Sequence, residues 1–464
     1  MNSTDFSSLA LSPELLSVVQ ELGYEELTPI QAASIPLLLD GKDIIGQSKT
    51  GSGKTAAFSL PILNKLDLSN QNIQALVICP TRELATQVVG EIRKLGRRHV
   101  GLKVLPLIGG QTGREQAQSL EKGVHIAVGT PGRILDHMNR ERIDLSDLAT
   151  VIFDEADKML EMGFEKELRA IMKDVPAKRQ TALFSATFPE AIQSLSRRYQ
   201  RNPMQIIVAE PEGQSSSIEQ IVYETEAEYK TNTLMRILQQ HPSNSTIVFC
   251  NMKATVNEIT ETIQENDVPC ASLHGDLDQR ERDRVMAMFR NGSIPLLIAT
   301  DVAARGLDIE NLEMVVNYDL PAQPETYVHR IGRTGRAGRT GTAVSLAGPR
   351  DTLKLLELEK LTGGKFLRPA LGFKNQHGLN KFAHQAAMQT ISISGGRKDK
   401  LRPGDILGAL TGAAGGLTAA DVGKIEMHDK FTYVAIAANV VDQALDRLRT
   451  GKIKGNKYQV KMMK

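Results

Sequence analysis

A glycine-rich run separates an apolar strand pattern from a helical pattern near the start of the chain. The apolar segment is Asp43–Gly46, and the run reads Ser48-Lys49-Thr50-Gly51-Ser52-Gly53-Lys54-Thr55. Strand, tight turn and helix in this order form the first half of a βαβ unit, so the run favours a parallel sheet covered by helices. The backbone N–H groups of such a turn can surround phosphate oxygens at the helix N-terminus.

An acidic motif follows a second apolar strand pattern. Asp154-Glu155-Ala156-Asp157 comes directly after Val151–Phe153, and Asp154 lies 100 residues after Lys54. A lysine in a glycine-rich turn can reach the β/γ-phosphates, and the Thr55 hydroxyl with the Asp154 carboxylate can hold Mg²⁺. Glu155 can position and deprotonate the attacking water. Together the two motifs predict a nucleotide-hydrolysing site.

Length and composition limit the class of protein. A chain of 464 residues with 41% hydrophobic and 24% charged residues is typical of two or three globular domains. It has no apolar run long enough to cross a bilayer and no basic, apolar N-terminal signal, so we expect a cytoplasmic protein without membrane contact. Cys79, Cys250 and Cys270 lack metal-ligand spacing, and the first two lie in apolar strand patterns that predict buried, reduced thiols.

The net charge of +2 hides an asymmetry along the chain. Residues 386–464 carry 13 Lys+Arg against 7 Asp+Glu, a net +6, whereas the preceding 385 residues carry 43 against 47, a net −4. A basic terminal module is typical of proteins that bind a polyanion such as a nucleic acid, although a merely solvated basic surface has the same composition.

Alternating strands and helices predict two α/β units in tandem, each built on a parallel sheet. The predicted parts are residues 1–208, a linker at 209–217, residues 218–368, a linker at 369–385, and residues 386–464. Strands are expected in the first unit at Asp43–Gly46, Ala75–Cys79, Val104–Ile108, His125–Val128, Val151–Phe153 and Thr181–Phe184. Those in the second are Thr246–Cys250, Cys270–Leu273, Leu296–Ala299, Met314–Asn317 and Gly341–Ser345. The strands at 75–79 and 246–250 look equivalent, but the second unit has no glycine-rich loop.

The third unit shows a β-α-β-β-α-β pattern. Its expected strands and helices are Thr390–Ser394, Pro403–Leu410, Lys424–Met427, Phe431–Ala437, Asn439–Leu448 and Tyr458–Met462. This order predicts a small α+β sheet with two helices on one face, as in RNA-recognition motifs. Phe431 and Tyr433 lie on one face of a strand, where they either stack on RNA bases or pack in a core.

About a dozen motifs over residues 6–345 resemble those of the DEAD-box RNA helicases. Besides the two motifs above, they are Phe6, Gly23-Tyr24, Thr28–Gln31, Pro80–Ala85, Gly109-Gly110, Thr130–Arg133, Ser185–Thr187, His274-Gly275 with Gln279 and Arg282, Ala299–Asp308 and His329–Arg336. Ser48 stands where this family more often has alanine. The tail segments Gly395–Lys398, Arg402–Gly412 and Gly451–Gly455 resemble the DbpA subfamily, so the likeness extends over nearly the whole chain.

The residues and the resemblance together assign roles. ATP binding is assigned to Phe6, Thr28, Gln31, Ser48, Lys49, Thr50, Gly51, Ser52, Gly53, Lys54, Thr55 and Asp308, and catalysis to Lys54, Asp154, Glu155, Arg333 and Arg336. Residues expected to couple hydrolysis to strand separation are Asp157, Ser185, Thr187 and His329. RNA contacts are assigned to Arg82, Gly110, Thr130, Arg133, Thr300, Asp301, Arg397, Lys398, Arg402, Lys452 and Lys454.

The resemblance implies two RecA-like domains followed by an RNA-recognition-motif-like domain, with ATP and Mg²⁺ as cofactors. It also implies that the tail recognises a hairpin of large-subunit ribosomal RNA and that the protein acts in assembly of the precursor subunit. Arg333 and Arg336 lie outside the unit with the phosphate loop, so they can assist hydrolysis only when RNA brings both units together. A DNA helicase and a non-catalytic RNA clamp remain as alternatives. The sequence does not indicate the oligomeric state.

Overall fold

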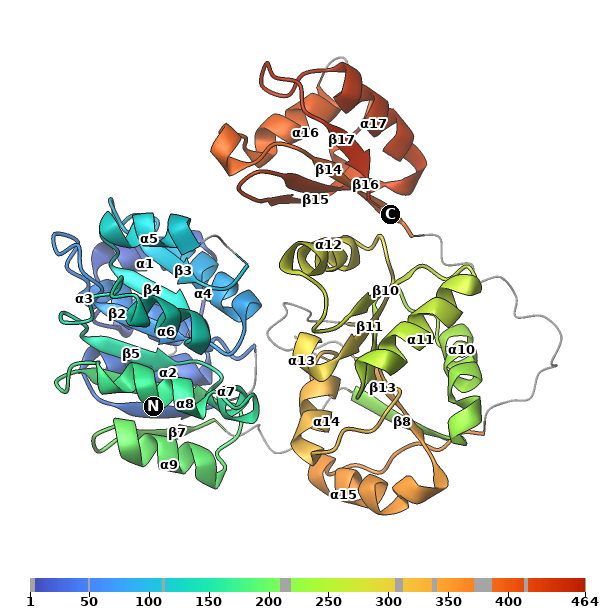
Figure 1. Ribbon diagram of the computed structural model, residues 1–464, viewed down its shortest axis with the longest axis horizontal. Coiled ribbons are helices and arrows are strands. Elements are labelled where there is room, and N and C mark those ends of the chain that lie inside the picture. The colour runs from blue at the N-terminus through green and yellow to red at the C-terminus, as the bar shows by residue number, and fades with distance from the viewer. Residues whose placement is uncertain are drawn as a thin grey trace. The chain divides into compact units, whose positions relative to one another are not determined.

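The computed structural model describes residues 5–48, 51–110, 113–208, 218–304, 312–335, 340–370, 386–412 and 416–463. These residues form two compact units, one containing the described residues up to 208 and the other those from 218 onward. In Figure 1 the first unit is blue to green, and the second continues through yellow to red. Among the described residues no helix is long and apolar enough to cross a bilayer.

The first unit contains a seven-stranded sheet in the order β3-β4-β2-β5-β6-β1-β7. The strands are β1 (Ile44–Gln47), β2 (Ala75–Ile78), β3 (Val104–Leu107), β4 (Ile126–Gly129), β5 (Thr150–Phe153), β6 (Gln180–Ser185) and β7 (Met204–Ile207). Every neighbouring pair is parallel, which confirms the predicted sheet. Consequently the loops that follow β5, β6 and β1, three adjacent strands, share one edge of the sheet.

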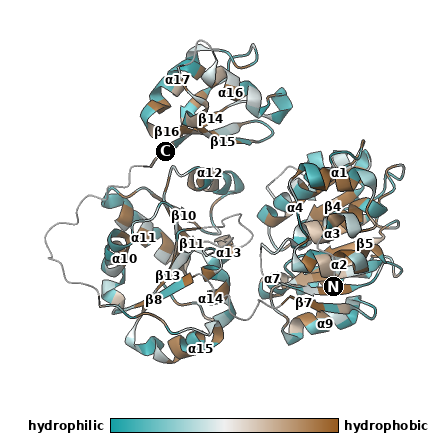
Figure 2. Ribbon diagram, turned by 180° about the vertical axis from the view of Figure 1, so that it is seen from behind, coloured by the Kyte–Doolittle hydropathy of each residue, from teal (hydrophilic) through white to brown (hydrophobic). Residues whose placement is uncertain are grey.

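Helices bury both faces of this sheet. On one face are α1 (Pro13–Glu21), α2 (Pro29–Leu39), α3 (Lys54–Lys65) and α4 (Arg82–Leu95). On the other are α5 (Gly113–Glu121), α6 (Pro131–Asn139), α7 (Ala156–Glu161), α8 (Glu165–Lys173) and α9 (Glu190–Tyr199). Successive strand residues point to opposite faces, so Val77 joins the first cluster whereas Leu76 and Ile78 join the second. This explains why the strands read as continuous apolar runs, coloured brown in Figure 2.

The second unit begins with a parallel sheet in the order β10-β11-β9-β12-β13-β8. The strands are β8 (Ile218–Glu224), β9 (Thr246–Cys250), β10 (Cys270–Leu273), β11 (Leu296–Thr300), β12 (Met314–Asn317) and β13 (Gly341–Ala347). One face is covered by α10 (Lys230–Gln240) and α11 (Lys253–Glu265), the other by α14 (Pro324–Ile331) and α15 (Thr352–Thr362). The order repeats β3-β4-β2-β5-β6-β1 of the first unit, so the predicted equivalence of β2 and β9 is confirmed.

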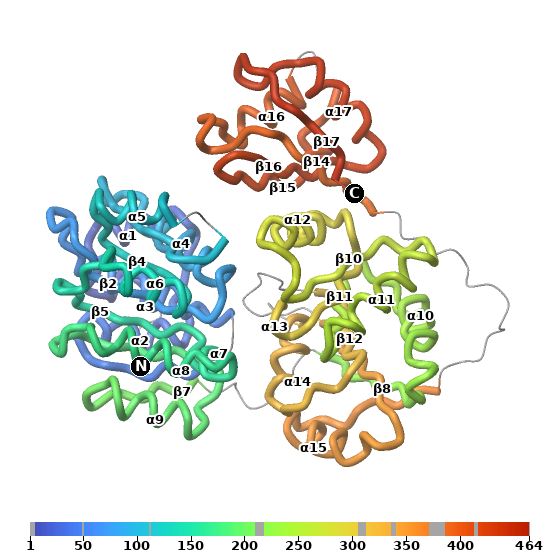
Figure 3. The backbone as a smooth tube through the Cα atoms, in the orientation of Figure 1, coloured from blue at the N-terminus to red at the C-terminus, as the bar shows by residue number. Residues whose placement is uncertain are grey.

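The remaining sheet of the second unit is antiparallel, in the order β15-β16-β14-β17. It contains β14 (Met388–Ile393), β15 (Val422–Met427), β16 (Thr432–Ala437) and β17 (Val460–Met462), with α16 (Pro403–Thr411) and α17 (Val441–Thr450) packed on one face. The backbone can be followed in Figure 3 from β14 to β17. The predicted β-α-β-β-α-β order, with two helices on one face, is confirmed.

The helix-free face of this small sheet contacts the loop and helix that precede β11. This helix is α12 (Gln279–Arg290), and the short α13 (Asp301–Ala304) follows β11. Arg290 donates two hydrogen bonds to the Glu426 carboxylate, at 2.9 and 2.8 Å. Ser293 and Thr390 share a buried hydroxyl contact of 2.6 Å, and Asn291 Nδ2 donates to the same hydroxyl at 3.2 Å. These contacts join the third sheet to the second α/β domain.

Two edge strands and six short turns of 3-10 helix complete the described structure. The strands β7 and β8 were not among the predicted ones. The turns are η1 (Phe6–Ser8), η2 (Ala227–Tyr229), η3 (Pro349–Asp351), η4 (Arg397–Asp399), η5 (Ala419–Asp421) and η6 (Ala438–Val440). All three cysteines are buried and unpaired, and no group of three metal-ligating side chains gathers within the described ranges.

Candidate functional site

The glycine-rich loop and the acidic motif meet at the carboxyl edge of the first sheet. The Ser48 N–H, just after β1, donates to the Ser185 carbonyl at the end of β6 (3.1 Å). The buried Lys54 begins α3, and its ammonium donates back to the Ser48 carbonyl at 2.8 Å. Asp154 follows β5 on the other side of β6. The predicted Lys54 and Asp154 are thus brought to the same edge, with the positive end of α3 beside them.

Gln31 and Thr28 form hydrogen bonds to backbone carbonyl groups of the glycine-rich loop. The Gln31 amide accepts from the Thr28 N–H at 3.0 Å and donates to the Gly53 carbonyl at 3.2 Å. The Thr28 hydroxyl donates to the Ser52 carbonyl at 2.8 Å. Both residues were predicted to bind ATP, and the structure also gives them a second task, fixing the shape of the loop.

Two positions explain the local sequence of the loop. Gly53 has φ +93°, and a Cβ there would lie 2.5 Å from Gln31 Nε2, so only glycine fits without displacing the amide. Ser48 replaces the alanine that is more usual in such loops, and its hydroxyl is 2.8 Å from the Ser52 hydroxyl. This extra hydrogen bond joins the two ends of the loop. Lys49 and Thr50 lie outside the described residues.

Asp154 is 3% exposed, and its surroundings perturb its titration strongly. Burial raises its pKa to about 7, with the charge of Lys54 opposing and that of Glu155 adding to the rise. A buried carboxyl beside like charges is poised to accept a cation in place of a proton. Its oxygens and the half-buried Thr55 hydroxyl are hard donors, the kind that Mg²⁺ prefers.

Glu155 has an unusual backbone for its residue type. It has φ +50° and ψ +53°, in the left-handed region, at the start of α7. Its N–H donates to Asp154 Oδ1 at 3.1 Å. A non-glycine residue in this region costs on the order of 1 kcal/mol, and such strain gathers at functional sites. The strained backbone therefore supports the prediction that Glu155 has a chemical role.

Asp157 connects the acidic motif to the end of β6. Its Oδ2 accepts from the N–H groups of Ala186 and Thr187 at 3.2 and 3.0 Å, and from the Thr187 hydroxyl at 3.0 Å. The coupling pair predicted at 157 and 187 is therefore in direct contact. The Ser185 hydroxyl, predicted to couple by hydrogen bonding, is buried and has no hydrogen-bond partner among the described residues.

Phe6 lies in the core of the first unit. It is 4% exposed, and its ring centroid is 6.1 Å from that of Tyr24. The aromatic ring is thus packed against the residues that precede α2, and its predicted stacking on adenine stays a prediction.

Two predicted RNA-contact residues of the first unit, Arg82 and Arg133, contact neighbouring parts of the protein. A Cβ at Gly109 would lie 2.6 Å from an Arg82 guanidinium nitrogen, so the Arg82 side chain passes directly over the Gly109-Gly110 turn. Thr130 precedes α6, and Arg133 in the first turn donates to Gln116 at 2.8 Å and to Asp136 at 2.9 Å.

In the second unit, Arg330 of the motif His329–Arg336 bonds to several residues at once. It is 2% exposed and binds both carboxylate oxygens of Asp301 at 2.6 and 2.7 Å. It also donates to Asn251, Asn317 and the Asp319 carbonyl. Asp301 is thus an ion-pair partner of Arg330, and its predicted contact with RNA stays a prediction. Arg330 is a site residue that the sequence interpretation missed. The clue was its spacing with Tyr327 and Ile331, which puts it on the buried face of α14.

Other predicted residues of the second unit are only partly described. His329 and Arg333 are half-buried, at the end of α14 and just beyond it, and Thr300 ends β11. Asp308 and Arg336 lie outside the described residues.

The basic residues of the tail converge on neighbouring loops. The Lys454 ammonium donates to the Lys400 carbonyl at 2.7 Å and is 3.5 Å from Asp405 at the start of α16. This ties the 451–456 turn to η4, where Arg397 and Lys398 lie, and to Arg402 before α16. Lys452 is exposed beside them. All five predicted basic contacts thus belong to one end of the small domain.

Of the aromatic pair of the tail, Tyr433 is buried and Phe431 is half-buried. Tyr433 is 5% exposed, and with Phe431 and His428 it forms a three-ring cluster with centroid separations of 4.4 to 5.3 Å. Tyr433 feels the charges of Asp283, Arg280 and Arg284, all on α12, and burial raises its pKa. The packing alternative is therefore the one that the structure favours for these two rings.

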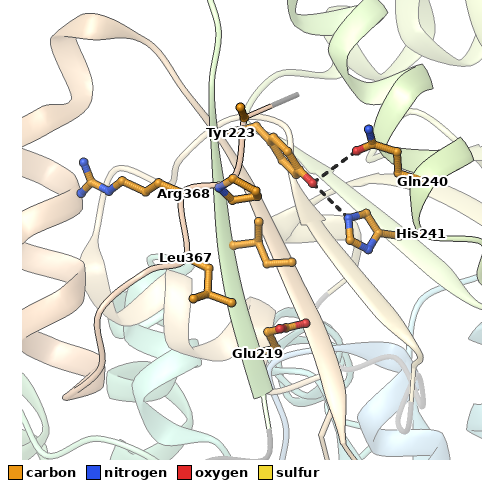
Figure 4. A pocket seen from close by; sticks show the side chains of 9 residues that line it. Glu219, Tyr223, Gln240, His241, Leu367 and Arg368 are labelled. Atoms are coloured by element: carbon orange, nitrogen blue, oxygen red, sulfur yellow. Dashed lines mark hydrogen bonds between the residues drawn. The ribbon is translucent and has the colours of Figure 1, made fainter. Parts of the chain in front are cut away.

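The second α/β domain also has an open hollow of about 620 Å³ beside the edge strand β8. Figure 4 shows Tyr223 pointing toward Gln240 and His241, with hydrogen bonds of 3.4 and 3.1 Å. None of its lining residues belongs to a predicted motif.

Three family models match successive parts of the chain. They are the DEAD/DEAH box helicase at residues 28–195, the helicase conserved C-terminal domain at 229–338, and the DbpA RNA binding domain at 390–462.

Similar proteins match over long stretches. The ATP-dependent RNA helicase DbpA of Escherichia coli strain K12 is 46% identical over 99% of this chain and 100% of its own length. The DEAD-box ATP-dependent RNA helicase CshA of Bacillus cereus is 47% identical, over 79% of this chain and 69% of its own. Among solved structures, S. cerevisiae Dbp5 bound to RNA and ADP BeF3 has a TM-score of 0.72 at 32% identity, covering 80% of this chain and 96% of that one.

Proposed function

We propose that this chain, which belongs to the DEAD-box ATP-dependent RNA helicases of the DbpA type, is directed by its tail to a hairpin of large-subunit ribosomal RNA. The family membership makes it an RNA-dependent ATPase. The observation that carries the proposal is the junction of basic loops at one end of the tail, where Lys454 bonds the Lys400 carbonyl. We further propose that it acts in the cytoplasm, on the precursor of the large ribosomal subunit.

The chemistry of hydrolysis follows from the first unit. Lys54 neutralises charge on the β/γ-phosphates, and Glu155 orients and deprotonates the attacking water. Asp154 and Thr55 are the residues that would hold Mg²⁺, which would neutralise further phosphate charge. Asp157 transmits a change at the acidic motif to Thr187, because the two residues share hydrogen bonds. Strand separation is thereby coupled to the state of the nucleotide.

Recognition of the hairpin divides into two physical parts. The exposed lysines and arginines of the tail bind phosphates, which gives affinity that falls with salt but no choice of sequence. Choice of sequence requires contacts to unpaired loop bases, since an A-form stem hides its base edges. The aromatic cluster at Tyr433 is buried, so we expect the bases to be read by loops around Arg397 and Lys452.

The test compares ATPase stimulation by the hairpin with stimulation by a shuffled RNA of equal length. We expect the intact chain to prefer the hairpin, and a chain ending at residue 385 to keep stimulation but lose the preference. Lys452→Ala with Lys454→Ala should weaken hairpin binding and flatten its salt dependence. Lys360→Ala with Lys365→Ala, two exposed lysines at and beyond α15, serves as control. A preference that survives truncation would place recognition in the helicase core.

A further inference from the structure

The first unit has a concave surface formed by residues outside the phosphate loop. It is a hollow of about 570 Å³ between α5 and α6. Four arginines line it together with two carboxylates; they are Arg114, Arg133, Arg140, Arg142, Glu121 and Asp136. We call it the arginine hollow. Its formal balance is four positive charges against two negative ones.

Two of the four guanidinium groups are held in place. Asp136 accepts from Arg133 on one oxygen at 2.9 Å and from Arg140 on the other at 2.8 Å. Gln116, which is 2% exposed, accepts a further bond from Arg133 at 2.8 Å and is itself fixed to the Pro106 and Ile108 carbonyls. Such ordering lowers the entropy cost of binding a ligand, because these side chains are already restrained.

The other two arginines are available to a ligand. Arg114 and Arg142 are exposed, and neither has an ion-pair partner among the described side chains. The positive charge of the hollow shifts the pKa values of neighbouring groups. Burial and then the charge of Arg133 lower the pKa of His137, which lies behind the hollow, and the hydrogen bond from Arg140 lowers that of Asp136. Asp136 therefore stays ionised at neutral pH and keeps its hydrogen bonds from Arg133 and Arg140.

The hollow is continuous with a predicted RNA contact. Arg133 belongs both to the motif Thr130–Arg133 and to the wall of the hollow. A Cβ at Gly113 would lie 3.0 Å from an Arg133 guanidinium nitrogen, so the glycine lets this side chain lie against the start of α5. Planar guanidinium groups at successive positions match the phosphates of a nucleic-acid strand better than they match a single small anion.

We propose that the arginine hollow is an additional RNA site, which binds the phosphates of a strand running past Thr130–Arg133. The site extends the core footprint beyond the assigned motifs and favours long RNA over short. It rests on the proposed function in one respect, that RNA is the ligand of the core.

The experiment uses the full chain with a non-hydrolysable ATP analogue. It compares three RNAs, none of which contains the hairpin. They are a short single strand, the same strand extended by about ten nucleotides at its 5′ end, and the same strand extended by about ten nucleotides at its 3′ end. The variant is Arg114→Ala with Arg140→Ala and Arg142→Ala. The control is Arg197→Ala with Arg198→Ala, two exposed arginines in the last turn of α9, beside the opposite edge of the sheet. Dissociation constants are measured by fluorescence anisotropy at several salt concentrations.

We expect the triple variant to bind one of the two extended strands on the order of tenfold more weakly. Its affinity for the short strand should be unchanged. The slope of log K against log salt should fall by about 2, as for three single-strand phosphate contacts. A triple Arg→Lys variant should lie between, since it keeps the charge and loses the planar fork. Unchanged binding of both extended strands, or equal loss for all RNAs, overturns the proposal. Equal stimulation of the unaltered chain by the hairpin and by the shuffled RNA would instead overturn the proposed function.

Discussion

Arg330 illustrates how one buried charge organises a set of loops. Its guanidinium joins residues that follow β9, β11 and β12, through Asn251, Asp301 and the Asp319 carbonyl, and it lies 5.1 Å from the Phe249 ring centroid. The motif around it was interpreted through His329, Arg333 and Arg336, with no role given to Arg330. Sequence could not reveal the partners, since they lie 11 to 79 positions away and meet only in the folded sheet.

We expect Arg330→Ala to destabilise the second unit by about 3–5 kcal/mol, because it leaves the Asp301 carboxylate without its partner. Lys253→Ala removes an ion pair whose side chains are 62% and 61% exposed, so it should cost less than about 1 kcal/mol. Urea denaturation measures both changes. Similar values for the two variants would contradict the importance of burial here.

At Glu155, we expect substitution by Gln to lower RNA-stimulated ATP hydrolysis by about 10²-fold or more, since the amide cannot take the proton of water. ATP and RNA should still bind, and RNA should be released more slowly. Glu165→Gln, at an exposed position of α8, is the control. The measurements are steady-state turnover and RNA dissociation, and turnover equal to that of the unaltered chain would assign the water to another residue.

Among the elements, strands that read as apolar runs were predictable, including the edge strand β10, whereas the edge strands β7 and β8 were not. Strands such as β9 and β12 are buried on both faces and read as apolar runs, and their predicted bounds match the structure. β7 exposes Met204 and Ile207, and β8 mixes charged with apolar residues, so neither has that signal. The contact of α12 with the small sheet was also beyond sequence, because Arg290 and Thr390 are ordinary surface types.

We expect Arg290→Glu to detach the small sheet from α12, because two carboxylates then face each other at a site where Glu426 is 12% exposed. Combining it with Glu426→Arg should restore docking through the reversed pair. Energy transfer between dyes on α11 and α17 measures the separation. Failure of the double variant to regain transfer would show that the pair contributes little to docking.

The same pair predicts a pH dependence. Burial raises the pKa of Glu426, but the hydrogen bonds and charge of Arg290, aided by Lys424, outweigh burial and hold it below the ordinary 4.5. A lowered folded-state pKa means that the stabilisation is complete above pH 4.5 and is lost as the pH falls through the lower value. Dye energy transfer should therefore stay constant from pH 7 to 5 and drop below 4.5. Arg290→Ala should remove this transition.

At the scale of the whole molecule, the phosphate loop and Arg333 belong to different compact units. We expect hydrolysis to need both, so Arg333→Ala should lower turnover by about 10³-fold with ATP affinity largely kept. Titration with a fluorescent ATP analogue and steady-state turnover separate the two effects. Near-normal turnover would remove Arg333 from the mechanism.

The repeat of strand order in the two α/β domains was only partly predictable. The equivalence of β2 and β9 followed from their similar apolar sequences. The full correspondence required the sheet, because order in space differs from order along the chain. In the first domain β1 leads into the glycine loop, whereas its counterpart β8 leads into η2 and α10.

The contacts of Thr390 with Asn291 and Ser293 bear on how such proteins can be redesigned. A targeting module transplanted alone onto a different helicase would lose these hydroxyl and amide partners and the Arg290 fork. The small sheet would then lack the contacts that fix its orientation on the second α/β domain, and RNA bound to the module would have no fixed orientation either. A chimaera that carries residues 290, 291 and 293 along with residues 386–464 transfers the RNA-binding domain together with the side chains that dock it.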